Sequence, residues 1–86
     1  MKDNGIVWYT ANEVRMVDSL ERKEHVMKVY AALKEKGYNP VSQIVGYILS
    51  DDPTYITNHN GARSLISHVE REDLLRDVLI CYLNAD

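Results

Sequence analysis

Three histidines and one cysteine are the side chains of this sequence best suited to bind a metal ion or act as a nucleophile. His25, His59 and His68 are separated by 34 and 9 residues, so no two lie four apart on a helix, and there is no H-E-x-x-H motif. Cys81 has no basic residue near it in the sequence that would activate its thiol, so we expect it to be buried and unreactive. The sequence therefore predicts no metal site and no cofactor.

An acidic run near the C-terminus is the second candidate for chemistry. It comprises Glu70, Glu72, Asp73 and Asp77. Such carboxylates could act as general acid and base or hold a divalent cation, but they more often form a solvated helix face with pairs such as Glu72 and Arg76. A small hydrolase or metal protein would need His59, His68 and this run to converge. The glycines are isolated and form no phosphate-binding loop, so we predict that the protein is not an enzyme.

Length and composition indicate one small globular domain. The chain has 86 residues, of which 45% are hydrophobic and 27% charged. A chain this short buries only roughly 60–65% of its unfolded surface, which favours self-association. A single cysteine excludes an internal disulfide and fits a reducing compartment, so we expect a cytoplasmic protein. We find no secretory signal and no apolar stretch long enough for membrane insertion.

The charge distribution bears on nucleic-acid binding. The net charge is −3, and the only basic cluster consists of Lys28, Lys34 and Lys36. The segment from Ala31 to Leu49 has the helix, turn and helix order of a helix-turn-helix motif, but residues 39–60 contain no Arg or Lys to contact phosphates or bases. We expect no nucleic-acid partner, and we keep a small nucleic-acid-binding regulator with this helix-turn-helix-like segment as the alternative.

The elements that position these residues begin with an N-terminal arm, residues 1–17, followed by a single helical domain, residues 18–86. The arm lacks sustained periodicity, and its apolar run Ile6-Val7-Trp8-Tyr9 has no second strand to pair with. We expect a flexible, loosely ordered arm whose Trp8 packs on the domain or on a partner subunit.

Capping residues and apolar spacing predict the helices of the domain. The first runs from Asp18 or Ser19 to Lys36 and ends at Gly37; the second starts at Asn39-Pro40 and ends near Ser50. The side chains expected to face inward on these two helices are Val26, Val29, Tyr30, Leu33, Val41, Ile44, Val45, Ile48 and Leu49.

A short helical turn at residues 54–56 follows Asp52-Pro53, and two more amphipathic segments complete the chain. Between them, Glu70 to Asp73 either continues one helix or starts a new one. The inward residues predicted here are Ala62, Leu65, Ile66, Val69, Leu74, Leu75, Val78, Leu79, Tyr82 and Leu83. We therefore predict an all-α fold, a compact bundle of about five short helices with a loosely ordered N-terminal arm.

One string of residues is more specific than an amphipathic helix requires. Lys36-Gly37-Tyr38-Asn39-Pro40 is followed by Gln43-Ile44-Val45-Gly46-Tyr47, and later by Asp52-Pro53-Thr54-Tyr55-Ile56, Ala62-Arg63 and Glu70-Arg71. Over residues 26–83 the chain closely resembles the IreB family of small regulatory phosphoproteins from Gram-positive bacteria. The main departure from the family pattern is in the arm, where Ile6-Val7-Trp8-Tyr9 occupies the region in which the family has a threonine followed by an acidic-aromatic stretch. Two smaller departures, Asp51 in place of the common Gly and Glu72-Asp73 in place of Asp-Glu, are not expected to disturb a helical core.

The resemblance implies a cytoplasmic, non-enzymatic, all-helical homodimer. It implies an arm whose threonines are phosphorylated by a membrane-bound Ser/Thr kinase with PASTA repeats, opposed by a cognate phosphatase. The implied output is control of cell-envelope stress responses and tolerance of cell-wall antibiotics, through an unknown downstream protein. Thr10 is the only threonine before the core, so it is the phosphorylation candidate by location; the other interpretation is an ordinary polar residue after an apolar anchor.

The family-like residues also have structural interpretations. Gly37 can end a helix with positive φ, and Gly46 within a helix points to a tight contact, internal or between subunits. Tyr47, Tyr55 and Arg63 are candidates for a partner surface, although we expect at least one tyrosine to pack in the core. The full set of family-motif and possible interface residues is Tyr38, Asn39, Pro40, Gln43, Gly46, Tyr47, Asp52, Pro53, Tyr55, Arg63 and Glu70.

Overall fold

The computed structural model describes residues 11–85, with side chains from residue 18 onward. Within this range the chain forms four α-helices and two single-turn 3-10 helices and contains no strand. Their bounds are α1 Ala11–Glu35, α2 Pro40–Ser50, η1 Pro53–Tyr55, η2 His59–Gly61, α3 Ala62–Ser67 and α4 Arg71–Leu83. The all-α prediction is confirmed. The prediction of about five short helices is wrong in detail, because α1 alone spans 25 residues and the predicted turn at residues 54–56 is a 3-10 helix.

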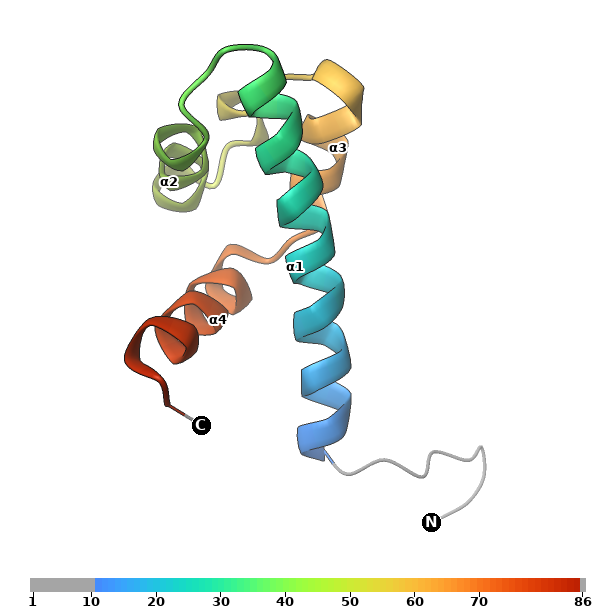
Figure 1. The fold of residues 1–86 in the computed structure, drawn as a ribbon, viewed down its shortest axis with the longest axis vertical. Coiled ribbons are helices and arrows are strands. Elements are labelled where there is room, and N and C mark those ends of the chain that lie inside the picture. The colour runs from blue at the N-terminus through green and yellow to red at the C-terminus, as the bar shows by residue number, and fades with distance from the viewer. Residues whose placement is uncertain (1–10, 86) are drawn as a thin grey trace.

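The long helix α1 is the axis on which the other elements are arranged (Figure 1). Helices α2, α3 and α4 each contact α1, and α2 also contacts α4. In the view of Figure 1, α2 and α4 lie on one side of α1 and α3 on the other, with α2 and α3 beside the C-terminal half of α1 and α4 beside its N-terminal half. No helix in the described part of the chain is both long enough and apolar enough to span a membrane.

The core contains one group of buried apolar side chains drawn from every α-helix. These are Val29, Ala32, Leu33, Tyr47, Ile56, Ala62, Ile66, Val69 and Leu74. Helix α1 supplies three of them: Val29 and Leu33 were predicted to face inward, whereas Ala32 was not. Residues 62–69 pack as predicted, with Leu65 only partly buried.

The predicted start of the first helix is wrong. Helix α1 begins at Ala11, so Asp18 and Ser19 lie within it and cap nothing. Asp and Ser are tolerated in a helix interior, and residues 11–17 contain no Gly or Pro that would stop the helix. Residues 11–17 of the predicted arm are therefore helical in backbone, whereas Trp8 and Thr10 lie outside the described residues.

A new helix begins within the charged segment Glu70 to Asp73, which is the second of the two alternatives left open by the sequence. Helix α3 ends in a turn in which His68 N–H donates to Leu65 O and Val69 N–H donates to Ile66 O. Helix α4 then starts at Arg71. Of the six apolar residues predicted to face inward on α4, only Leu74 is buried.

Other predicted core residues are exposed as well. On α1 and α2 these are Tyr30, Val41, Val45 and Leu49.

Cys81 on α4 is also exposed, so the prediction of a buried thiol is wrong. An amphipathic pattern indicates that one face of a helix is apolar, but it does not indicate whether the same chain covers that face. Helix α4 rests on the domain near Leu74 and leaves the rest of its apolar surface open.

Candidate functional site

The turn from α1 to α2 holds the first family-like residues and is closed by backbone hydrogen bonds. Gly37 has φ +89°, and its N–H donates to Lys34 O at 3.1 Å, while Tyr38 N–H donates to Leu33 O at 3.0 Å. This is a Schellman motif, in which a residue with positive φ ends the helix. The predicted role of Gly37 is confirmed, and the Tyr38 side chain is left half-exposed.

Helix α2 begins as the sequence predicts. The Asn39 side-chain oxygen accepts a hydrogen bond from Ser42 N–H at 3.0 Å, and Pro40 occupies the first turn, where an N–H is not required. Gln43 N–H donates to the backbone oxygen of Asn39 at 3.1 Å. Three of the family-motif residues, Asn39, Pro40 and Gln43, thus lie at the start of one helix.

Gly46 lies directly under the ring of Tyr55. A Cβ atom at Gly46 would lie 2.5 Å from Tyr55 Cδ1 and 2.8 Å from Tyr55 Cε1, closer than van der Waals contact allows. The tight contact predicted at this glycine is therefore present within the chain, between α2 and η1. Tyr55 remains about half-exposed on its outer side.

Tyr47 is a core residue. Its side chain is 3% exposed, and its hydroxyl donates to Val69 O at 3.0 Å, which links α2 to the segment between α3 and α4. Burial raises the pKa of the phenol, so it stays protonated and keeps donating at neutral pH. Tyr47 is therefore not available to a partner, contrary to one of its predicted roles.

The end of α2 and the start of η1 involve two adjacent aspartates. Asp51 takes a left-handed conformation, φ +56°, and its N–H donates to Tyr47 O at 2.8 Å. That conformation favours glycine, so Asp51 holds it at some cost in backbone strain. Asp52 accepts hydrogen bonds from Thr54 N–H and from the Thr54 hydroxyl, which lower the pKa of Asp52 and cap the turn that begins at Pro53.

The last two family-like residues lie at separate places. Arg63 Nε donates to the backbone oxygen of Ile56 at 2.9 Å and so joins α3 to the end of η1. Glu70 is exposed at the start of α4, where its side chain makes no capping hydrogen bond and its carbonyl accepts from Leu74 N–H. Arg63 is thus half-buried and engaged within the chain, and Glu70 is free of the core.

The main contact that the sequence did not indicate joins α1 to α4. Arg22 Nε and Nη2 donate to the two carboxylate oxygens of Asp77 at 2.7 and 3.0 Å, and Asp73 Oδ2 lies 3.9 Å from Arg22 Nη1. The hydrogen bond to Asp77 raises the pKa of Arg22, and the same bond lowers the pKa of Asp77. The residues are 55 positions apart, so no local sequence signal could have paired them.

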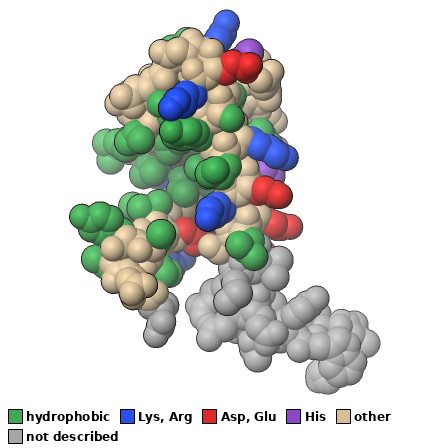
Figure 2. Space-filling model, viewed as in Figure 1, with side chains coloured by type: hydrophobic (Ala, Val, Ile, Leu, Met, Phe, Trp, Pro, Cys, Tyr) green, Lys and Arg blue, Asp and Glu red, His purple; other side chains and the backbone are tan. Residues whose placement is uncertain are grey.

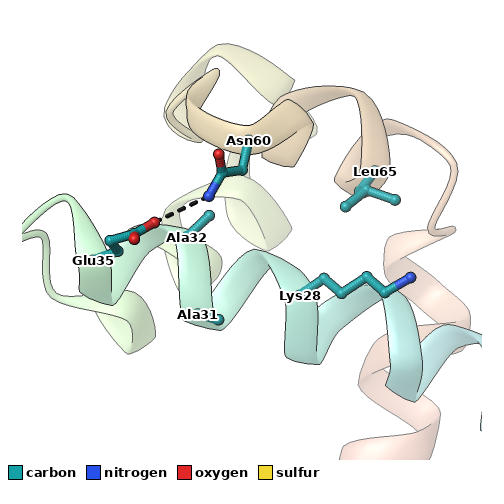
Figure 3. Close-up of a pocket in the computed structure, with 6 residues that line it drawn as sticks. All are labelled: Lys28, Ala31, Ala32, Glu35, Asn60 and Leu65. Carbon is teal, nitrogen blue, oxygen red and sulfur yellow. Dashed lines mark hydrogen bonds between the residues drawn. The ribbon is translucent and has the colours of Figure 1, made fainter.

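A shallow hollow of about 460 Å³ lies where η2 and α3 meet α1 (Figure 3). Its apolar wall contains Ala31, Ala32 and Leu65. At one end, Glu35 Oε1 accepts from Asn60 Nδ2 at 3.0 Å and lies 2.7 Å from His59 Nε2, so these polar groups satisfy one another.

The residues considered for catalysis do not converge. His59 contacts Glu35, His68 contacts the backbone oxygen of Ser64, and Glu72 and Asp73 pair with Arg76. The predicted pair between Glu72 and Arg76 is confirmed at 3.1 Å. Within residues 18–85, whose side chains the structure describes, no group of three or more His, Cys, Asp or Glu side chains is arranged to hold a metal ion.

Comparison with known proteins identifies relatives over most of the chain. Residues 9–84 match the family described as "IreB regulatory phosphoprotein". The chain is also similar to a UPF0297 protein of Acetivibrio thermocellus, with 67% identity over 63 residues, or 73% of this chain and 70% of the relative.

Proposed function

The chain belongs to the IreB family of regulatory phosphoproteins, and from this membership we propose that it is a non-enzymatic, cytoplasmic regulator switched by a membrane Ser/Thr kinase of the PASTA type and a cognate phosphatase. Its output is control of cell-envelope stress or cell-wall antibiotic tolerance, through a downstream protein. The observation that carries the proposal is the family match, which covers nearly the whole described domain.

Thr10 is the proposed phosphorylation site. Of the three threonines, Thr54 donates its hydroxyl to Asp52 and Thr57 accepts from His59 N–H, so both hydroxyls serve turns of the fold. Thr10 immediately precedes Ala11, the first residue of α1. A phosphate adds about −1.5 to −2 charges, which are favourable beside the positive end of a helix. Phosphorylation would therefore stabilise the first turns of α1.

The experiment that tests this function is site-resolved mass spectrometry of the protein recovered from its native cells under cell-wall stress. We expect phosphate on Thr10, no phosphate in a Thr10→Ala strain, and retained phosphate in a matched Thr10→Ser strain, since a Ser/Thr kinase accepts either hydroxyl. A fully covered, unmodified Thr10 under every stress would contradict the proposal.

We further propose that the protein acts as a homodimer and has no nucleic-acid partner. Support for the dimer comes from the apolar side chains that α2 and α4 leave uncovered. Two of the three lysines considered for nucleic acid lie against other parts of the chain: Lys34 Nζ lies 5.8 Å from the centre of the Tyr30 ring, and Lys28 borders the hollow beside α1. Binding of DNA or RNA that weakens steeply with salt would argue for the nucleic-acid alternative.

A further inference from the structure

Asn60 and Gly61 form a chemically labile pair on the surface of the domain. Asparagine is prone to lose its side-chain amide, most readily before glycine, because glycine has no Cβ to hinder attack by its backbone nitrogen. Both residues are exposed and lie in η2, the turn that leads into α3. The other Asn-Gly pair of the sequence, Asn4-Gly5, lies outside the described residues.

The reaction at such a pair is a deamidation through a cyclic intermediate. Gly61 N attacks Asn60 Cγ, the new N–Cγ bond closes a succinimide ring, and Nδ2 leaves as ammonia with the proton of the Gly61 amide. Water then opens either carbonyl–nitrogen bond of the ring, which restores the amide proton and leaves aspartate or isoaspartate at position 60. Water is the only other reactant.

The backbone of η2 keeps the two reacting atoms apart. Asn60 has a left-handed conformation, φ 53° and ψ 30°, in which the bond from its carbonyl carbon to Gly61 N is nearly anti to its Cα–Cβ bond. Ring closure requires these two bonds to be nearly eclipsed, so the peptide must first rotate. Gly61 N–H also donates to Asn58 O at 3.2 Å, a bond that this rotation breaks. The closed turn is therefore unreactive.

The Asn60 side chain is held against the end of the long helix (Figure 3). Its Nδ2 donates to Glu35 Oε1 at 3.0 Å, and His59 Nε2 lies 2.7 Å from the same oxygen. Glu35 is the last residue of α1, so this cluster ties η2 to α1. These contacts oppose the opening of the turn and so oppose the reaction.

The product does not fit the closed turn. The hydrogen bond with His59 lowers the pKa of the Glu35 carboxyl, which is therefore ionised at neutral pH. Aspartate at position 60 would bring a second carboxylate to Glu35 in place of an N–H donor, at a helix end where negative charge is already unfavourable. Isoaspartate would add a methylene group to the backbone of the turn itself. Either product weakens the contact between η2 and α1.

From this arrangement we infer that Asn60-Gly61 is a deamidation site controlled by the opening of η2, and that its reaction loosens η2 from α1 irreversibly. The inference goes beyond the proposed function and does not rest on it. Among the described elements η2 contacts α1 and α3 but neither α2 nor α4, whose side of the molecule carries the gathered hydrophobic side chains in Figure 2. The modified fraction therefore grows with the time that a copy spends with this turn open.

Mass spectrometry of the full-length protein, incubated at neutral pH, tests the site. Replacement of the side-chain NH2 by OH changes the peptide mass, and a synthetic peptide of residues 56–64 in the same buffer gives the rate without the fold. We expect Asn60 to react about ten- to a hundredfold more slowly in the protein than in the peptide. Equal rates would overturn control by the turn. An Asn60 still intact when the hundredfold limit requires half conversion would overturn the site.

Glu35→Ala tests whether α1 holds the turn closed. Glu24 of the same helix lines a separate hollow with Leu20 and Met27, so Glu24→Ala is the matched control. We expect the reaction at Asn60 to be about threefold faster or more in Glu35→Ala and to change less than about 1.5-fold in Glu24→Ala. The rate at Asn4 in each sample corrects for differences in buffer. An unchanged rate at Asn60 in Glu35→Ala would overturn the role of this contact.

Asn60→Asp reproduces one product and tests its effect on the fold. The control is Asn58→Asp, since Asn58 is exposed in the same turn and its side chain makes no capping hydrogen bond. At one protein concentration we expect Asn60→Asp to lower Tm by about 3 °C or more and Asn58→Asp to change it by less than about 1 °C. Glu35→Gln combined with Asn60→Asp should recover about half of the loss or more. Equal shifts in the two aspartate variants would overturn the loosening of η2, and would leave the kinase-substrate proposal unaffected.

Discussion

At the residue scale, the family-like positions act mainly by shaping turns and close contacts. Gly37 ends α1, Asn39 caps α2, and Asp52 caps η1 through its hydrogen bonds to Thr54. Each of these roles depends on a backbone conformation or a hydrogen bond that few other residues can provide. The specificity of the motif is therefore structural at these positions.

The contact between Gly46 and Tyr55 predicts that Gly46→Ala changes the free energy of unfolding in opposite directions with and without the Tyr55 ring. Alanine at position 46 favours helix by about 1 kcal/mol over glycine, but its Cβ would displace the Tyr55 ring, a kind of overpacking that costs about 1–3 kcal/mol. We expect Gly46→Ala to lower the free energy of unfolding by about 1 kcal/mol.

The control is the same substitution in a Tyr55→Ala protein. With the ring removed, only helix propensity remains, so Gly46→Ala should now raise the free energy of unfolding by about 1 kcal/mol. Urea unfolding of the four proteins measures this coupling. Equal effects of Gly46→Ala in both backgrounds would show that the ring does not restrict position 46.

At the element scale, α4 is held by one buried side chain and by an ion pair to α1. Leu74 is the one buried side chain of α4, whereas Arg22 holds Asp77 by two hydrogen bonds between partly buried groups. Paired charges of this kind contribute about 1 kcal/mol when solvent reaches them. The ionised Asp77 carboxylate therefore adds to the contacts that hold α4 against α1.

Asp77→Asn should make stability less sensitive to acid. Since the folded pKa of Asp77 is lowered by Arg22, the pair stabilises the protein above the ordinary carboxyl pKa, and this stabilisation is lost as pH falls through the folded pKa. We expect the variant to be about 1 kcal/mol less stable at pH 7 and to approach the wild type below about pH 4. Urea unfolding across this range gives the difference directly.

Glu72→Gln is the matched control on the same helix. Among the described residues Glu72 pairs with Arg76, four residues away, and its side chain is largely exposed, so we expect a change below about 0.5 kcal/mol at neutral pH. A difference between Asp77→Asn and wild type that stays constant from pH 7 to pH 3 would show that the ion pair does not set the stability of this contact.

At the scale of the whole molecule, the dimer should make thermal stability depend on concentration. Unfolding of a dimer releases two chains, so mass action stabilises the folded state as concentration rises. For a protein of this size, a tenfold increase in concentration is expected to raise Tm by about 5 °C. Calorimetry over a hundredfold range measures the slope, and a Tm that does not change would contradict a dimer coupled to folding.

The sequence by itself determined the local features of this protein. The ends of α1 and α2 at Gly37 and Asn39-Pro40, the turn at Asp52-Pro53 and the pair of Glu72 with Arg76 each depend on residues within about five positions, and the structure confirms all of them. The family was also predicted from the sequence, on the string that begins at Lys36-Gly37-Tyr38-Asn39-Pro40, and the comparisons confirm it.

Only the tertiary structure decided which apolar faces are covered and which distant residues meet. The same amphipathic spacing leaves Leu79 exposed and buries Leu74, and the inward side chain of α2 is Tyr47 rather than Val45. Arg22 and Asp77 are too far apart in sequence for any local pattern to pair them. Burial and long-range pairing depend on how whole helices pack against one another, whereas caps and turns depend on neighbouring residues.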